Sequence, residues 1–206
     1  MANREFRDRL KRRAKAVNLT LDAALAEQLE VYYQLLAKWN AKINLTSLTD
    51  ADAAIDRLLL EPLSAALALP SHANLIDLGS GGGSPAIPLA LALETKRLVM
   101  VESRGRKAAF LREAGRSIGL TTVVENTRFE DVAAQGTYAG LMDVVSIRAV
   151  RPDLNTLVIA KAFLTPHGRV ALFSPKAASP PKLPDGLRVV HVSPLLDSAH
   201  LILLGR

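Results

Sequence analysis

A glycine-rich turn directly after a short apolar run is the feature that most constrains the fold of this chain. The run Leu75–Leu78 reads as a buried strand, and four glycines follow it between residues 79 and 83. Glycine allows a sharp turn and lets a ligand approach the backbone without interference from a Cβ atom. Ser84 is the expected N-cap and Pro85 the expected first residue of the next helix. Strand, glycine turn and helix together predict a parallel α/β sheet with a ligand at the carboxyl end of its first strand.

The part of the chain after residue 70 repeats the alternation of strand and helix. Apolar runs predict strands at 98–101, 123–124, 142–147 and 169–173, and helices at 104–118 and 153–163. Two further runs, 187–192 and 201–204, have no helix between them and are expected to pair as an antiparallel hairpin. A mostly parallel sheet that ends in such a hairpin resembles the Rossmann-like fold of S-adenosylmethionine-dependent methyltransferases more than the all-parallel dinucleotide-binding fold.

The first 70 residues read as helices. We expect a basic helix at 3–16, a second helix from Thr20 as N-cap to Trp39, and a third from about Thr49 toward Leu69, kinked or divided by Pro62. The change of pattern predicts an N-terminal helical extension at 1–70 and an S-adenosylmethionine-binding methyltransferase domain at 71–206.

Positive charge is concentrated in two segments. Residues 1–15 hold seven basic and two acidic side chains, and so account for five of the six net positive charges of the chain. A second cluster consists of Arg104, Arg106, Lys107, Arg112 and Arg116. Clustered cations attract polyanions, because bound phosphates release their counterions. For the N-terminal arm, contact with nucleic acid and a merely solvated helix stay equally open. For the second cluster a solvated surface is the favoured interpretation.

The glycine turn alone does not decide whether the cofactor is a dinucleotide or S-adenosylmethionine. Gly81-x-Gly83-x-x-Ala86 fits a dinucleotide-binding pattern loosely, with Glu102 at the right distance for ribose hydroxyls. Counted from the strand, Asp77-x-Gly79-x-Gly81-x-Gly83 resembles the acid-then-glycines signature of the methyltransferase superfamily. The terminal hairpin favours S-adenosylmethionine as the cofactor.

Two other functions stay open on the sequence. An NAD-dependent reductase would need a Tyr-x-x-x-Lys pair, but no Lys lies at that spacing after Tyr138. A non-catalytic RNA-binding protein that has kept a cofactor pocket is the second alternative.

Four segments resemble one family, the bacterial 16S rRNA guanine-N-7 methyltransferases (RsmG, or GidB). Trp39–Thr46 is similar to the WN-x-x-x-NLT signature of that family, which is the most specific of these motifs. The glycine turn with Pro85–Leu89 resembles its glycine loop and the residues that follow the loop. Arg128–Asp131 and Ser146–Ala149 are similar to two shorter motifs. The order of the segments also agrees, so the resemblance covers nearly the whole chain.

The resemblance implies a site, a cofactor and a partner. It implies transfer of a methyl group from S-adenosyl-L-methionine to N-7 of a guanine in small-subunit ribosomal RNA. The implied cofactor-binding residues are Gly79, Gly81, Ser84, Glu102, Phe129, Glu130 and Arg148. Among them, Glu102 would hold the ribose, Phe129 and Glu130 would lie beside the adenine, and Arg148 would position the methyl donor or the incoming base.

The chain departs from the family at three places. Leu58, Glu61 and Pro62 stand where the family usually shows a His and then an Asp-Ser pair. Ser84 replaces a common Leu, and Phe173-Ser174, with Lys176 two residues later, replaces a Lys-Gly pair. We expect the departures to affect the part that faces RNA more than the cofactor half.

The composition excludes several other chemistries. The chain has no Cys, which rules out disulfides, thiolate metal sites and Cys nucleophiles, and its four His residues are scattered, so we expect no metal. Its apolar stretches are too short to cross a bilayer, and no secretory signal is visible. We therefore expect a cytoplasmic protein that has no membrane partner, and we favour a monomer over an oligomer.

Overall fold

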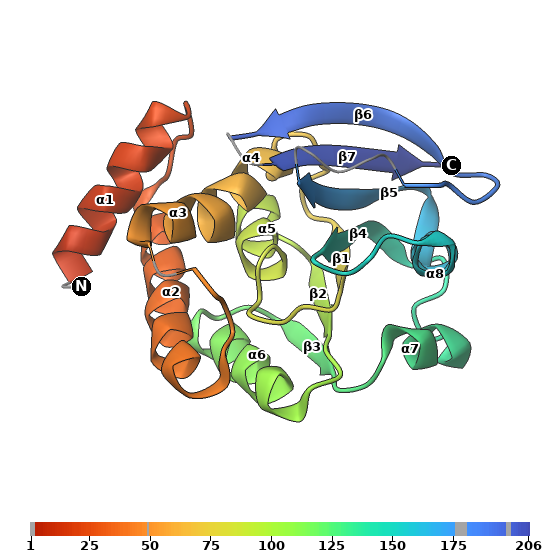
Figure 1. Ribbon diagram of the computed structural model, residues 1–206, viewed down its shortest axis with the longest axis horizontal. Coiled ribbons are helices and arrows are strands. Elements are labelled where there is room, and N and C mark those ends of the chain that lie inside the picture. Colours follow the sequence, from red (N-terminus) through yellow and green to blue (C-terminus); the bar gives the residue numbers. More distant parts are fainter. Residues whose placement is uncertain (1–2, 49, 176–180, 197–198) are drawn as a thin grey trace.

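The computed structural model describes residues 3–48, 50–175, 181–196 and 199–206. Its centre is a seven-stranded sheet in the order β3-β2-β1-β4-β5-β7-β6 (Figure 1). The strands are β1 Asn74–Leu78, β2 Arg97–Val101, β3 Thr122–Glu125, β4 Met142–Arg148, β5 Leu164–Pro175, β6 Arg188–Leu195 and β7 Ala199–Gly205. The first five strands are parallel to one another, and β7 pairs antiparallel with both β5 and β6. The predicted terminal hairpin is therefore confirmed, and β5 is longer than predicted.

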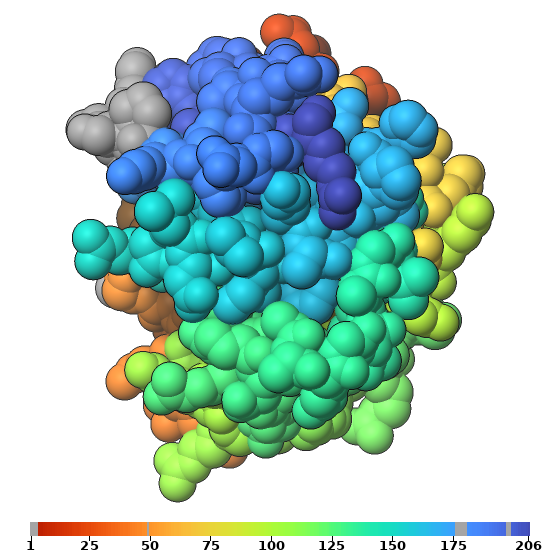
Figure 2. Space-filling model, turned by 90° about the vertical axis from the view of Figure 1, so that its right-hand side faces the viewer, coloured from red at the N-terminus to blue at the C-terminus, as the bar shows by residue number. Residues whose placement is uncertain are grey.

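Helices cover both faces of the sheet because alternate strand residues point to opposite sides. In β1, Leu75 belongs to one buried cluster, whereas Ile76 and Leu78 belong to the other. The first cluster packs under α5 (Ala86–Leu93) and α6 (Gly105–Ser117). The second packs under α7 (Phe129–Gln135) and α8 (Leu154–Phe163), which form one side of the molecule with the C-terminal strands (Figure 2). The helices on the two faces of the sheet thus hold the loops at the carboxyl ends of the strands in place.

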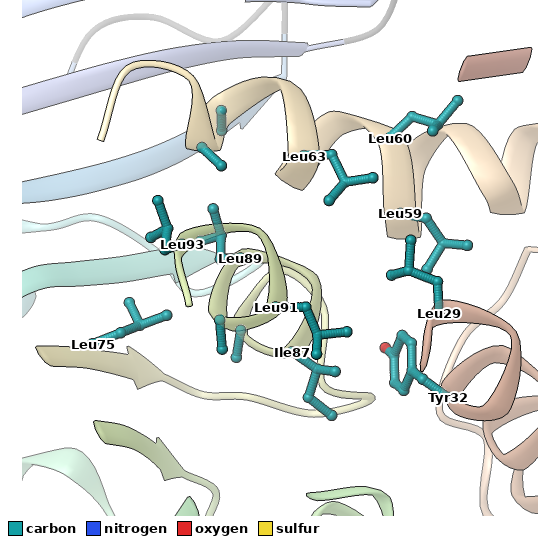
Figure 3. Close-up of a cluster of buried hydrophobic side chains, with 14 of the residues drawn as sticks. Leu29, Tyr32, Leu59, Leu60, Leu63, Leu75, Ile87, Leu89, Leu91 and Leu93 are labelled. Carbon is teal, nitrogen blue, oxygen red and sulfur yellow. The ribbon is translucent and has the colours of Figure 1, made fainter. Parts of the chain in front are cut away.

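The N-terminal helices share the first of these clusters. They are α1 Asn3–Ala16, α2 Ala23–Ile43, α3 Ala51–Ile55, the π-helical turn η1 Asp56–Leu60 and α4 Glu61–Ala66. Figure 3 shows Tyr32 of α2 beside Leu59 of η1 and Ile87 of α5, in one continuous core. We propose that 1–70 is an extension of the methyltransferase domain, and this shared core supports the proposal. None of the described helices is both long and apolar enough to cross a membrane.

Side-chain hydrogen bonds at the helix ends correct one of our predicted starts and agree with another. The second helix is capped by Asp22, whose carboxylate accepts a hydrogen bond from the N–H of Leu25 at 2.7 Å, and not by Thr20. The same helix continues past Trp39 to Ile43. Thr49 lies outside the described residues, and the next helix is capped by Asp50.

The basic N-terminal segment is a packed helix rather than a free arm. Phe6, Leu10 and Ala14, at helical spacing, are buried in the core. On either side of this apolar stripe, Arg7 pairs with Glu30, and Arg13 pairs with Asp52 and Asp56. Arg9 also pairs with Asp52. Three of the seven basic side chains of residues 1–15 are therefore paired with carboxylates of other helices.

Candidate active site

Three cavities adjoin one another at the carboxyl ends of the strands. The central cavity, about 590 Å³, is lined by the glycine turn, by the segment after α2 and by Arg148. The Phe129 cavity, about 260 Å³, shares Gly79, Glu102 and Val150 with it. The Phe173 cavity, about 220 Å³, shares Arg57, Arg148, Ala149 and Val150 with it. This is the edge of the sheet at which we predicted a ligand from the sequence.

The glycine turn has a backbone conformation that residues with a side chain rarely adopt. Gly79, Gly81 and Gly83 have φ angles of 78°, 50° and 83°. A Cβ atom on Gly79 would lie 2.5 Å from Cγ2 of Val150, so the two segments approach as closely as their atoms allow. The Tyr32 hydroxyl donates to the carbonyl of Gly82 at 2.6 Å, which ties the turn to α2.

Replacing Gly79 with alanine should cost about 2 kcal/mol of unfolding free energy and weaken cofactor binding, because the new methyl group must displace Val150. Gly119→Ala is the matched control, since Gly119 also has a positive φ (72°) but a Cβ there meets nothing within 4 Å. That control should cost about 1 kcal/mol and leave binding unchanged. Urea denaturation and cofactor titration measure the two effects. Equal losses for the two variants would contradict the role of the close contact.

Glu102 lies at the end of β2, between the central and Phe129 cavities. One carboxylate oxygen accepts from the N–H of Gly81 at 2.9 Å and the other from the N–H of Arg104 at 2.8 Å. The side-chain amide of Asn126 donates to the backbone carbonyl of Glu102 at 2.9 Å. Each carboxylate oxygen keeps a further acceptor position, because a carboxylate has about four lone-pair sites. The sequence predicted Glu102 but not Asn126, for which it gave no signal.

Asp77, the acid of the glycine signature, is buried below the turn. It accepts a hydrogen bond from the Ser146 hydroxyl at 2.5 Å. Burial is the largest influence on its carboxyl group and raises its pKa from 3.8 to about 6, although the hydrogen bond from Ser146 acts in the opposite direction. The side chain thus joins β1 to β4 below the cavity.

The titration of Asp77 gives a pH-dependent stability that can be measured. A raised pKa in the folded state stabilises the protein fully below about pH 4, and this stabilisation disappears as the pH rises through about 6. The unfolding free energy of the wild type, relative to Asp77→Asn, should therefore fall by roughly 2.4 kcal/mol between pH 4 and pH 7. The asparagine keeps an acceptor for Ser146 and does not titrate. Urea denaturation at the two pH values tests this, and an unchanged difference would contradict it.

Arg148 is almost enclosed by protein groups. One guanidinium nitrogen donates to the carbonyl of Arg57 at 2.6 Å and to the Ser84 hydroxyl at 3.1 Å. The other forms an ion pair with Glu61, and the guanidinium lies 4.8 Å from the ring centre of Phe173. Burial lowers the pKa of Arg148 to about 10, and the charge of Glu61 partly offsets this effect.

The π-helical turn η1 explains why the carbonyls of Arg57 and Leu58 can accept hydrogen bonds from the side chains of Arg148 and Ser84. The N–H of Glu61 bonds to the carbonyl of Asp56, five residues earlier. Pro62 has no N–H, so it cannot bond to the carbonyl of Arg57 or Leu58. Arg148 donates to the first of these carbonyls, and the Ser84 hydroxyl donates to the second at 2.8 Å.

Two sequence expectations at these positions are wrong. Glu61 and Pro62 do not face RNA, because both are buried beside the glycine turn. Ser84 is not an N-cap, since its hydroxyl is engaged by Leu58 and Arg148, and α5 begins at Ala86 after Pro85. Glu61 is instead the ion-pair partner of an internal cation, Arg148.

The structure places the remaining predicted residues on the same cavities. Gly79, Gly81, Ser84, Glu102 and Arg148 line the central cavity, and Phe129 and Glu130 line the Phe129 cavity. Their contacts with a cofactor stay a prediction. In the WN-x-x-x-NLT segment, the Asn40 side chain accepts from the N–H of Thr46 at 2.8 Å and so brings Thr46 to the central cavity. We had not predicted Thr46 as a site residue.

Comparisons with known proteins agree with this arrangement. The GidB family model, described as rRNA small subunit methyltransferase G, matches residues 25–179. A curated relative of that name from Stenotrophomonas maltophilia is 37% identical over 86% of this chain and 83% of its own. One from Myxococcus xanthus is 33% identical over 82% and 78%. Among solved structures, a SAM dependent methyltransferase from Aquifex aeolicus has a TM-score of 0.59 at 15% identity and covers 78% of this chain and 95% of that one.

Proposed function

The chain belongs to the GidB family of rRNA small subunit methyltransferases, and we propose that it transfers a methyl group from S-adenosylmethionine to N-7 of a guanine in small-subunit ribosomal RNA. The observation that carries the proposal is the position of Glu102 between two cavities, with acceptor positions left on both carboxylate oxygens. The alternative of a reductase has little support, because the Tyr138 hydroxyl donates to Glu125 and Tyr138 is absent from the described lining of the three cavities.

The residues fit the cofactor from one end to the other. Glu102 would accept hydrogen bonds from the ribose hydroxyls, and the half-buried ring of Phe129 would pack against the adenine. The turn at Gly79 would leave room for the methionine part, because no Cβ atom intrudes there. When bound, S-adenosylmethionine supplies a methyl group activated by its sulfonium sulfur.

The reaction makes modest demands on protein side chains. Guanine N-7 has an in-plane lone pair and no proton, so the lone pair forms the new N–C bond directly. The S–C bond breaks with its electron pair on sulfur, the purine gains the positive charge, and no proton leaves. The protein needs to align nucleophile, methyl group and sulfur, which the fixed turn and the buried Arg148 pair would do by holding the cavity walls.

Exposed and partly exposed cations around the cavities suit a polyanionic substrate. Arg104 and Lys107 line the central cavity, and Arg128 lines the Phe129 cavity. They come from the second basic cluster and from the loop before α7, so this cluster is a better candidate for phosphate contacts than the packed helix α1.

Methyl transfer to isolated small subunits tests the proposed function. Subunits from cells that lack this protein should accept methyl groups, and nucleoside mass spectrometry with cleavage mapping should place 7-methylguanine at one position. Subunits from wild-type cells are the control and should accept almost none. Cofactor binding without transfer to any form of the RNA would support the non-catalytic alternative, and methylation of another atom would overturn the N-7 assignment.

A further inference from the structure

The Phe173 cavity is not needed to hold the cofactor. It lies between the carboxyl ends of β4 and β5 and reaches Ile202 on β7. Most of its wall is apolar, and this part consists of Ile147, Ala149, Val150, Pro152, Leu172 and Phe173, with Pro175, Pro181 and Ile202. Ser174, Arg57 and Arg148 supply its polar groups. The cavity therefore offers a mostly apolar surface with a few polar groups.

We propose that the Phe173 cavity receives the acceptor base, a single purine turned out of folded RNA, an inference that rests on the proposed function. Enzymes that modify a base in structured nucleic acid take it out of its stack into a pocket with apolar or aromatic walls. At about 220 Å³ the cavity is smaller than the range of about 300–1,000 Å³ typical of drug-sized ligands, and a single base fits that scale.

The position of the cavity matches what the transfer requires. It meets the central cavity at Ala149 and Val150, and Val150 is the residue in contact distance of the glycine turn. A base in the Phe173 cavity thus faces the part of the central cavity beside Gly79. The floor is rigid, because Arg148 stacks on Phe173 and is fixed by Glu61 and by the carbonyl of Arg57.

An open groove leads from this cavity to the surface. The groove, about 550 Å³, shares Pro152 and Pro181 with the Phe173 cavity and is lined by two exposed cations, Arg151 and Lys182. It is also lined by one carboxylate, that of Asp153, which caps α8 by accepting from the N–H of Thr156. The elements around it, α8 and the C-terminal strands, belong to the face in Figure 2, where the N-terminal helices reach only the margins. A nucleotide with its base inside would place its phosphates along this groove, where the two cations attract them.

The family departure at Phe173-Ser174 also lies on this cavity. Ser174 is half-buried, and within the part of the chain that the structure describes its hydroxyl donates one hydrogen bond, a long one of 3.5 Å to the carbonyl of Pro175. Lys176 lies outside the described residues. A larger side chain at Ser174 would therefore enter the space assigned to the base without breaking a strong contact.

Ser174→Phe tests the assignment. The variant should bind S-adenosylmethionine as the wild type does, while kcat/KM for unmethylated small subunits falls by about tenfold or more, because the base cannot reach its position. Val158→Phe is the control, since Val158 is 52% exposed on α8 and is absent from the described lining of the cavities. Transfer by Ser174→Phe equal to that of the control would overturn the proposal.

A second variant keeps the test valid if Ser174→Phe does not fold. Arg151→Glu with Lys182→Glu should raise KM for the RNA and lessen the slope of log affinity against log salt by about 1.4, with cofactor affinity retained. Lys96→Glu with Arg97→Glu makes the same charge change at the opposite edge of the sheet, where β2 begins, and should leave the slope unchanged. If the wild type transfers methyl groups and the groove variant behaves like the wild type, the proposed acceptor site is wrong but the proposed function stands. If the wild type transfers no methyl group, the proposed function itself is wrong.

Discussion

Replacing Arg148 with alanine should lower the free energy of unfolding by about 4 kcal/mol, because it removes the cation from a buried ion pair with Glu61. The side chains of Arg148 and Glu61 are only 8% and 1% exposed, so water cannot replace the lost charge. The carbonyl of Arg57 also loses its donor. Urea denaturation at pH 7 measures the loss.

A paired substitution separates the cost of removing one charge of the ion pair from the cost of lost packing. Glu61→Leu with Arg148→Met removes both charges and should recover most of the stability, because buried ion pairs are often replaceable by apolar groups of similar volume. Arg9→Ala is the control, since its pair with Asp52 is partly exposed and should contribute less than about 1 kcal/mol. A loss for Arg148→Ala as small as that of the control would contradict the described enclosure.

Replacing Glu102 with alanine should weaken the affinity for S-adenosylmethionine by about a hundredfold, or roughly 2.7 kcal/mol. The variant loses the proposed charge-assisted bonds to the ribose, and it also releases the N–H groups of Gly81 and Arg104. Glu102→Gln keeps one acceptor and should show an intermediate loss. Glu113→Gln, on α6 and absent from the described lining of the cavities, should bind normally. Equilibrium dialysis measures all three, and an affinity for Glu102→Ala within about threefold of the wild type would contradict the role of Glu102.

The sheet could be predicted from the sequence because the residues that determine each strand lie close together along the chain. The apolar runs of β1, β2 and β4 and the glycine turn each lie within a few residues, so their structure could be predicted from neighbouring side chains. Helix α7, Phe129–Gln135, was not predicted, because a helix of seven residues shows too little periodicity. The start of α2 was misplaced because Thr20 and Asp22 are both good capping residues and only the backbone selects between them.

The candidate site was only partly predictable for a related reason. Gly79 and Glu102 follow consecutive parallel strands, and such strand ends must meet at one edge of the sheet. The pairing of Arg148 with Glu61 joins residues 87 positions apart and depends on carbonyls that a π turn and Pro62 leave free. No local pattern encodes that contact, and the Phe173 cavity likewise needs several distant segments to close it.

Cofactor binding is tested most directly by a calorimetric titration of the purified protein, stripped of any ligand, with S-adenosylmethionine. We expect saturable heat with one site per chain, abolished by prior addition of S-adenosylhomocysteine and strongly reduced in Glu102→Ala. Absence of saturable heat from correctly folded protein would contradict the claim that the edge of the sheet beside Gly79 and Glu102 binds this cofactor.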